Sequence, residues 1–117
     1  MTDRDRRFWA EFGRTLMLYV SRLLEEGKIT DYAIETNISG GKEQASTSVL
    51  MRICDKSYMS FYVPAVGGNI GYYNAPHSDE LTRLTICVAV HLNRIRMDAD
   101  RTLCRDCAGT RETGNGD

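Results

Sequence analysis

Residues 45–64 read ASTSVLMRICDKSYMSFYVP, and this stretch decides the fold. Apolar and polar side chains alternate along residues 45–54 and again along residues 58–63, with the period of two that places them on opposite faces of a strand. The three residues between these segments leave room only for a tight turn. Pro64 ends the second segment, because proline has no N–H to donate to a strand ladder. The stretch therefore predicts an antiparallel hairpin with one face toward a core and one toward water.

The same pattern continues on both sides of this hairpin. Residues 32–38, YAIETNI, alternate in the same way, and the turn-forming segment SGGKEQ at residues 39–44 joins them to the hairpin. Beyond Pro64, residues 69–74, NIGYYN, predict a short additional strand. Together these segments predict an antiparallel meander of three to four strands.

An amphipathic helix is predicted before the sheet. Thr2 or Asp3 caps it, and it runs to about Glu26 and stops at Gly27. Large apolar side chains fall on one broad face of this helix and charged side chains on the other. The apolar face consists of Phe8, Trp9, Phe12, Leu16, Tyr19, Val20 and Leu23.

A second helix is predicted after the sheet, and it has two apolar faces. Ser78 caps it, and it runs to about Met97. Ile86, Val90 and Met97 cluster on the side where a surface helix is normally polar. We predict that these three residues form a subunit or partner interface; the alternative is that the C-terminal tail or the first helix covers them. The core stripe on the opposite side consists of Leu81, Leu84, Val88, Leu92 and Ile95.

These elements predict an α+β fold with the order α-β-β-β-(β)-α. Two helices lie on one face of a three- to four-stranded antiparallel sheet, because neither helix can bury its apolar stripe alone. Residues 1–100 are expected to form a single domain. Residues 101–117 contain few large apolar groups, so we expect a flexible C-terminal tail.

The composition argues against several functional classes. The chain of 117 residues carries 15 basic and 16 acidic side chains, a balance that favours neither nucleic acid nor a membrane surface as the partner. The longest apolar runs, residues 16–20 and 86–90, are far shorter than the roughly 18 residues of a membrane span. The N-terminus has no signal-peptide pattern, so we expect a cytoplasmic protein with reduced cysteines.

The glycine-rich segment 67–77 is a candidate ligand site. Its glycines would let the backbone approach a ligand, although they form no phosphate-binding motif and Asp79 and Glu80 would repel a phosphate. The sequence favours a structural turn here, with a small nucleotide-like ligand as the alternative. In that alternative Asn74 is an exposed loop amide, and the contacts come from Tyr72, Tyr73, Asn74 and His77.

The four cysteines offer a weak metal signal. Cys104 and Cys107 have the CxxC spacing of zinc ligands, and Cys87 and His91 are four residues apart on the second helix. A cluster of these four residues requires the tail to fold back. The alternative is a free cysteine pair in a loose tail, and no cofactor is expected. Catalysis by Cys54 or Cys87 would need a histidine base within reach, and no catalytic motif is present.

The α-β-β-β-α order resembles the double-stranded-RNA-binding domain in topology. That family has a lysine cluster at the start of its second helix to contact phosphates, whereas residues 77–83 read HSDELTR here, so we do not assign the chain to it. A different nucleic-acid site is predicted on the solvent-facing side of the sheet, where Arg52, Tyr58 and Tyr62 could stack on bases. Nucleic acid remains a partner that the sequence disfavours.

The second apolar stripe and the lack of a catalytic motif predict a non-enzymatic protein-binding module that forms a homo-oligomer. Its small size is typical of an inhibitor or accessory protein of a phage or other mobile element that acts on a host protein. Two alternatives remain open: sequestration of a nucleotide-like ligand at residues 67–77, and weak nucleic-acid binding on the open sheet face.

Overall fold

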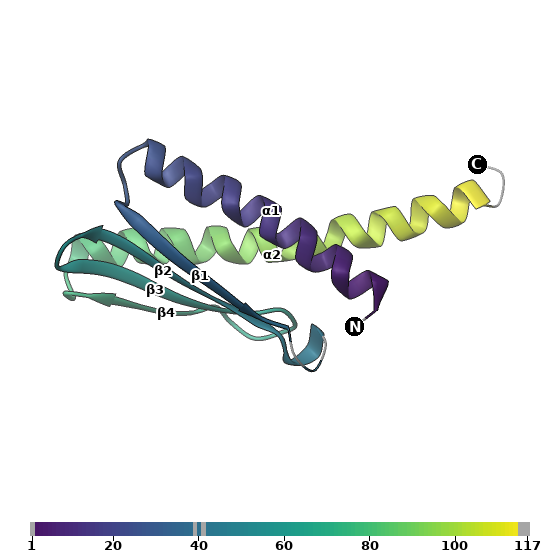
Figure 1. The fold of residues 1–117 in the computed structure, drawn as a ribbon, viewed down its shortest axis with the longest axis horizontal. Helices are drawn as coiled ribbons and strands as arrows, with labels where there is room; N and C mark the ends of the chain where they lie inside the picture. The colour runs from purple at the N-terminus through teal and green to yellow at the C-terminus, as the bar shows by residue number, and fades with distance from the viewer. Residues whose placement is uncertain (1, 39, 41, 115–117) are drawn as a thin grey trace.

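A computed structural model gives the fold of the chain (Figure 1). It describes residues 2–38, 40 and 42–114, and it describes side chains up to Arg101 apart from that of Lys42. The α+β fold with a four-stranded antiparallel sheet is confirmed, and the additional strand forms. The elements are α1 (Asp3–Glu25), β1 (Asp31–Asn37), the 3-10 helix η1 (Lys42–Gln44), β2 (Ser46–Cys54), β3 (Ser57–Pro64), β4 (Gly71–Ala75) and α2 (Asp79–Gly114).

The sheet is an antiparallel meander with the strand order β1-β2-β3-β4. The register places Val49 opposite Phe61 and Arg52 opposite Tyr58, so opposite residues share a face as the alternation predicts. The face turned to the helices is buried at its centre, and the other face is open to water. The buried side chains of β2 and β3 are Thr47, Val49, Met51, Met59, Phe61 and Val63.

Both helices complete one hydrophobic core with the apolar face of the sheet. α2 packs along β3 and β4, and α1 packs against α2, so α1 lies over the β1 half of the sheet. Phe8 and Val20 of α1 and Leu92 of α2 are fully buried. The second layer that the sheet needs therefore comes from two helices side by side.

The beginning and the end of α1 follow from local chemistry. The Thr2 hydroxyl accepts from the Asp5 N–H at 3.1 Å, and the Asp5 carboxylate accepts from the Thr2 N–H at 3.4 Å, which together form a capping box. After the helix, Gly27 has a φ of +74°, a conformation that glycine adopts without strain. The predicted bounds of this helix are confirmed within one residue.

α2 is longer than the sequence pattern predicted. Its start is confirmed, since the Leu81 N–H donates to the Ser78 hydroxyl at 3.1 Å. Its backbone, however, remains helical to Gly114, whereas we expected the helix to end at about Met97. The prediction relied on apolar periodicity, which fades after Met97, although helical hydrogen bonds need no apolar side chains. The side chains of residues 102–117 lie outside the described part of the chain, and the flexible tail at residues 101–117 stays a prediction.

Candidate interaction surfaces

The second apolar face of α2 is exposed in the structure. Ile86, Val90 and Met97 are 43%, 55% and 48% exposed, whereas Leu92 on the opposite side is fully buried. The first helix packs on the core side of α2, and the backbone after Arg101 continues the helix instead of folding back. Neither of the expected covers therefore lies on these three residues, which we call the α2 stripe.

Three arginines border the α2 stripe. Arg83, Arg94 and Arg101 are 11 and 7 residues apart, close to whole numbers of helical turns, so they share one side of α2. Arg101 lies 3.6 Å from Asp98, while Arg83 and Arg94 form no ion pair with any residue that the structure describes. An open hollow of about 310 Å³ lies along the latter part of the stripe and is lined by Val90, Asn93, Arg94, Met97, Asp98 and Arg101. The surface is apolar along its centre and cationic along one side.

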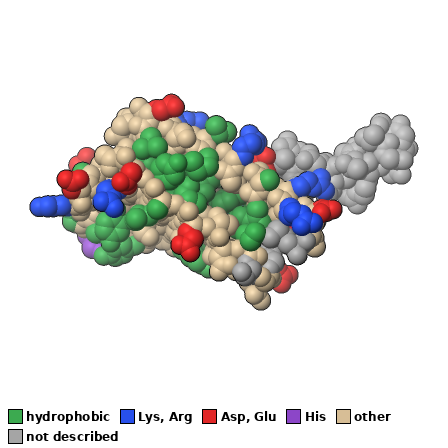
Figure 2. Space-filling view, in the orientation of Figure 1, with side chains coloured by type: hydrophobic (Ala, Val, Ile, Leu, Met, Phe, Trp, Pro, Cys, Tyr) green, Lys and Arg blue, Asp and Glu red, His purple; other side chains and the backbone are tan. Residues whose placement is uncertain are grey.

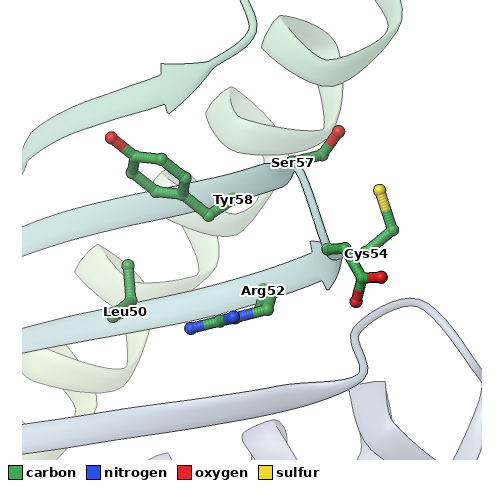
Figure 3. Close-up of a pocket in the computed structure, with 6 residues that line it drawn as sticks. Leu50, Arg52, Cys54, Ser57 and Tyr58 are labelled. Carbon is green, nitrogen blue, oxygen red and sulfur yellow. The ribbon is translucent and has the colours of Figure 1, made fainter.

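The open face of the sheet brings together the residues predicted to stack on bases. Arg52 and Tyr58 are register partners on β2 and β3, and Tyr62 lies further along β3 on the same face with 53% exposure. Arg52 and Tyr58 line an open hollow of about 410 Å³ with Leu50 between neighbouring strands (Figure 3). The Nε atom of Arg52 is 3.4 Å from the Asp31 carboxylate, so its charge is already partly neutralised. The face is aromatic without being basic.

The four residues of the predicted ligand site do not form one site. Tyr72 and Asn74 point to the helix side of β4, because they are register partners of Phe61 and Met59. Tyr73 points to the open face, where its ring lies 5.2 Å from His77 and 6.2 Å from Tyr58. The alternation of β4 thus divides the predicted set between two faces of the sheet.

Asn74 has a structural position. We expected an exposed loop amide, but Asn74 is only 4% exposed, and this expectation was wrong. Its amide nitrogen donates to the Pro76 carbonyl and to the Thr82 hydroxyl, both at 3.4 Å. The side chain therefore connects the end of β4 to the first turn of α2.

The glycine-rich connection between β3 and β4 is held by a buried arginine that the sequence analysis missed. Arg96 of α2 is 8% exposed and donates to the carbonyls of Pro64, Gly67 and Gly68 at 2.9–3.1 Å. Its guanidinium also donates to the Asn93 side chain at 2.6 Å. Gly67 and Gly68 have φ values of +63° and +69°, which explains the glycines at this turn. These three carbonyls of the connection are thus hydrogen-bonded within the domain.

Burial is the main reason why the pKa of Arg96 is lowered. The three carbonyls and the Asn93 amide oxygen compensate for the water that the guanidinium loses. The charge of Asp100 acts in the opposite direction and raises the pKa of Arg96. We call this arrangement the Arg96 clasp. Its only sequence signal is an arginine beside the core stripe of α2.

A stacked aromatic pair lies where α1 crosses α2. The rings of Tyr19 and His91 are 3.8 Å apart and nearly parallel. Burial raises the pKa of Tyr19 to about 12, and burial followed by the charges of Arg22 and Arg94 lowers the pKa of His91. Cys87 is exposed and unpaired near this stack. The pair has a packing role, and His91 is engaged with Tyr19.

The predicted metal cluster has no geometric support. The structure describes no group of three or more potential metal ligands in the part of the chain whose side chains it gives. The helical backbone places Cys104 seventeen residues beyond Cys87, roughly 25 Å along the axis. The fold-back that would join Cys87 and His91 to Cys104 and Cys107 does not occur, and the side chains of the last two cysteines lie outside the described residues.

Cys54 is an exposed thiol at the turn between β2 and β3. A hydrogen bond with the Ser57 side chain and then one with the Lys56 backbone lower its pKa. Both histidines of the chain are engaged elsewhere, His77 with Tyr73 and His91 with Tyr19. The thiol has no histidine base beside it, so a nucleophile–base pair is not formed.

No family model matches the chain, and no curated protein or solved structure does either. Within the described residues, none of the helices has the length and apolar character needed to cross a membrane.

Proposed function

We propose that the protein is a non-enzymatic protein-binding module that contacts another protein through the α2 stripe. The observation that carries this proposal is the exposure of Ile86, Val90 and Met97 on a helix whose opposite side is buried in the core. Contiguous apolar surface with a polar border is typical of interaction sites. Full burial of such a side chain contributes about 1.5–3 kcal/mol. These three side chains are 43–55% exposed, so a contact would gain about half of that from each of them.

The arginine border indicates the chemistry of the partner. Arg83 and Arg94 have no ion pair among the described residues, so a partner with an acidic rim beside an apolar ridge or groove would complement this surface. A second copy fits less well. In an antiparallel two-fold pairing of α2, the arginine rows of both copies would come to the same side of the contact. We therefore favour a different, acidic protein.

Capture from an extract of the host, followed by mass spectrometry, tests this function with two matched variants. Val90→Glu places an unpaired charge in the α2 stripe, whereas Leu18→Glu places the same charge on α1 at a residue that is also exposed, by 59%. We expect the parent chain and Leu18→Glu to retain the same protein and Val90→Glu to lose it at an unchanged melting temperature. Equal capture by both variants would contradict the proposal.

The identity of the captured protein also tests the narrower prediction of an inhibitor or accessory protein of a mobile element. A host enzyme whose activity changes when the parent chain is added would support it. A captured protein whose activity is unaffected by saturating amounts of the chain would contradict it.

A second candidate function rests on the open face of the sheet. Tyr58, Tyr62 and Tyr73 lie on this face on adjacent strands, an arrangement on which single-stranded nucleic acid can stack. The face has no excess of free cations, so we expect weak binding at most. Fluorescence anisotropy with a labelled single-stranded oligonucleotide, for the parent chain and for Tyr62→Ala, distinguishes weak stacking from no binding.

A further inference from the structure

β1 forms an edge of the sheet that has no bulge, proline or lysine, and its only charged side chains are those of Asp31 and Glu35. It pairs with β2 over seven residues without a break in register, and no strand among the described residues pairs with its other side. Residues 31–37 contain no proline, lysine or glycine. Natural sheets commonly blunt edges with short strands, bulges, proline or lysine, because unpaired N–H and C=O groups pair readily with another strand.

The apolar surface continues from β1 onto one flank of α1. Tyr32 on the helix side of β1 is 36% exposed and Met17 of α1 is 39% exposed, while Ile34 and Leu24 are half-buried at the margin of the core. Figure 2 shows an apolar area in the middle of the face turned to the viewer, where α1 runs in Figure 1. The flank of α1 that continues it contains Trp9, Gly13, Met17 and Leu24 and has no charged side chain.

We propose that the protein forms a two-fold homodimer in which β1 pairs antiparallel with β1 of a second copy. The pairing makes one eight-stranded sheet with all four helices on the same face, because a two-fold axis perpendicular to the sheet keeps its faces. The apolar flanks of the two α1 helices approach each other across this axis.

The sequence of β1 is compatible with itself in this arrangement. When the two-fold axis passes through Ile34, each Ile34 faces Ile34 of the second copy. Tyr32 then faces Thr36 of the second copy, and Ala33 faces its Glu35. Asp31 faces Asn37, so no two carboxylates are opposite each other, and like charges directly opposite would destabilise the pair. The Asp31 carboxylate is moreover already beside Arg52.

The size of a stable interface explains why α1 has to contribute. A specific contact buries about 800 Å² on each partner, more than one strand edge of seven residues supplies. The flank of α1 adds aromatic and aliphatic area next to the edge, and at Gly13 an added Cβ would meet no atom within 4 Å. This notch between Trp9 and Met17 lets a second backbone or side chain come close. The dimer contact is therefore distinct from the α2 stripe.

Light scattering of the full chain at tens of micromolar, with matched variants of α1, tests the dimer. The parent chain should have twice the monomer mass of 13.2 kDa. Met17→Glu should raise the dimer dissociation constant about tenfold or more, since it buries an unpaired charge at the contact. Leu18→Glu, next in sequence and about 100° further round the helix, lies outside this flank and should leave the dimer intact.

Hydrogen exchange on the parent chain gives a readout that needs no variant. The amides of residues 31–37 should exchange more slowly as the protein concentration rises, while those of residues 71–75 stay unchanged. A monomer at all concentrations, or a dimer that Val90→Glu dissociates and Met17→Glu does not, would overturn the proposal. If Met17→Glu fails to fold, Tyr32→Lys on the edge itself replaces it, and a dimer that survives this change would equally overturn it.

Discussion

The two edges of the sheet are completed in different ways. At β4 the strand is short and α2 packs along it. Asn74 ties the end of β4 to the helix, and the Arg96 clasp holds the connection before β4. At β1 the strand is longer, and every residue of it is at least partly exposed. In this domain α2 covers the β4 side of the sheet, whereas β1 on the other side stays exposed. Side-chain hydrogen bonds from buried residues thus hold the β4 side to α2, and the more exposed edge lies on the β1 side.

The Arg96 clasp is expected to give the largest effect on the β4 side. Arg96→Ala removes four hydrogen bonds and leaves carbonyl groups of residues 64–68 without their donor, so we expect a loss of about 2–4 kcal/mol in the free energy of unfolding. Urea titration followed by circular dichroism measures it. Arg94→Ala, an exposed arginine two residues earlier on α2, should change stability by less than about 0.5 kcal/mol.

Lysine at the same position sharpens this test. Arg96→Lys keeps the charge but has one ammonium group in place of a planar fork, so it cannot reach several carbonyls with the same geometry. Its stability should fall between those of the parent chain and Arg96→Ala. Equal stabilities of Arg96→Ala and Arg94→Ala would contradict the clasp.

The sequence was informative wherever a local rule acts alone. The alternation in residues 45–64 predicted the hairpin, and Thr2 and Ser78 predicted the two helix starts. Arg96 could not be found in this way, because the three backbone carbonyls that it binds lie 28–32 residues earlier in the chain. Asn74 was misjudged since a run of glycine and tyrosine residues has no clear alternation. The exposure of the α2 stripe followed from helical periodicity, whereas the open flank of α1 depends on which half of the sheet each helix covers.

Asn74→Ala should produce the second-largest effect. Asn74 is buried, and its loss leaves the Pro76 carbonyl and the Thr82 hydroxyl without this donor, so we expect destabilisation by about 1–2 kcal/mol. Thermal unfolding of Asn74→Ala and of Asn69→Ala, an exposed asparagine in the preceding connection, makes the comparison. A similar melting temperature for the two variants would show that the amide contributes little to the β4 edge.

Gly13→Ala should stabilise the monomer, because the flank of α1 that contains Gly13 has room for a methyl group. Gly13 is in the interior of α1, where glycine costs roughly 0.5–1 kcal/mol relative to alanine, and the added methyl group meets no atom within 4 Å. Unfolding should be measured at a concentration too low for association. Gly27→Ala is the matched control with the opposite sign, since Gly27 has a φ of +74°. A loss of stability in Gly13→Ala would mean that the flank of α1 is filled within the monomer.

The smallest effect is expected at His91 of α2, which stacks on Tyr19 of α1. Its pKa is lowered below the ordinary value of 6.5, mainly by burial and then by Arg22 and Arg94. The unfolded chain therefore binds a proton at a higher pH than the folded chain does. Folding stability should rise with pH from the lowered pKa to about 6.5 and gain nothing further from this group above it.

His91→Gln removes the group. The difference in stability between the parent chain and this variant therefore separates the contribution of His91 from that of the carboxylates. The difference should decrease as the pH falls below 6.5, and the change should be modest because His91 is only half-buried. A difference that is constant with pH would mean that the ring titrates in the folded protein as it does in the unfolded chain, and that the stack with Tyr19 does not exclude water from it.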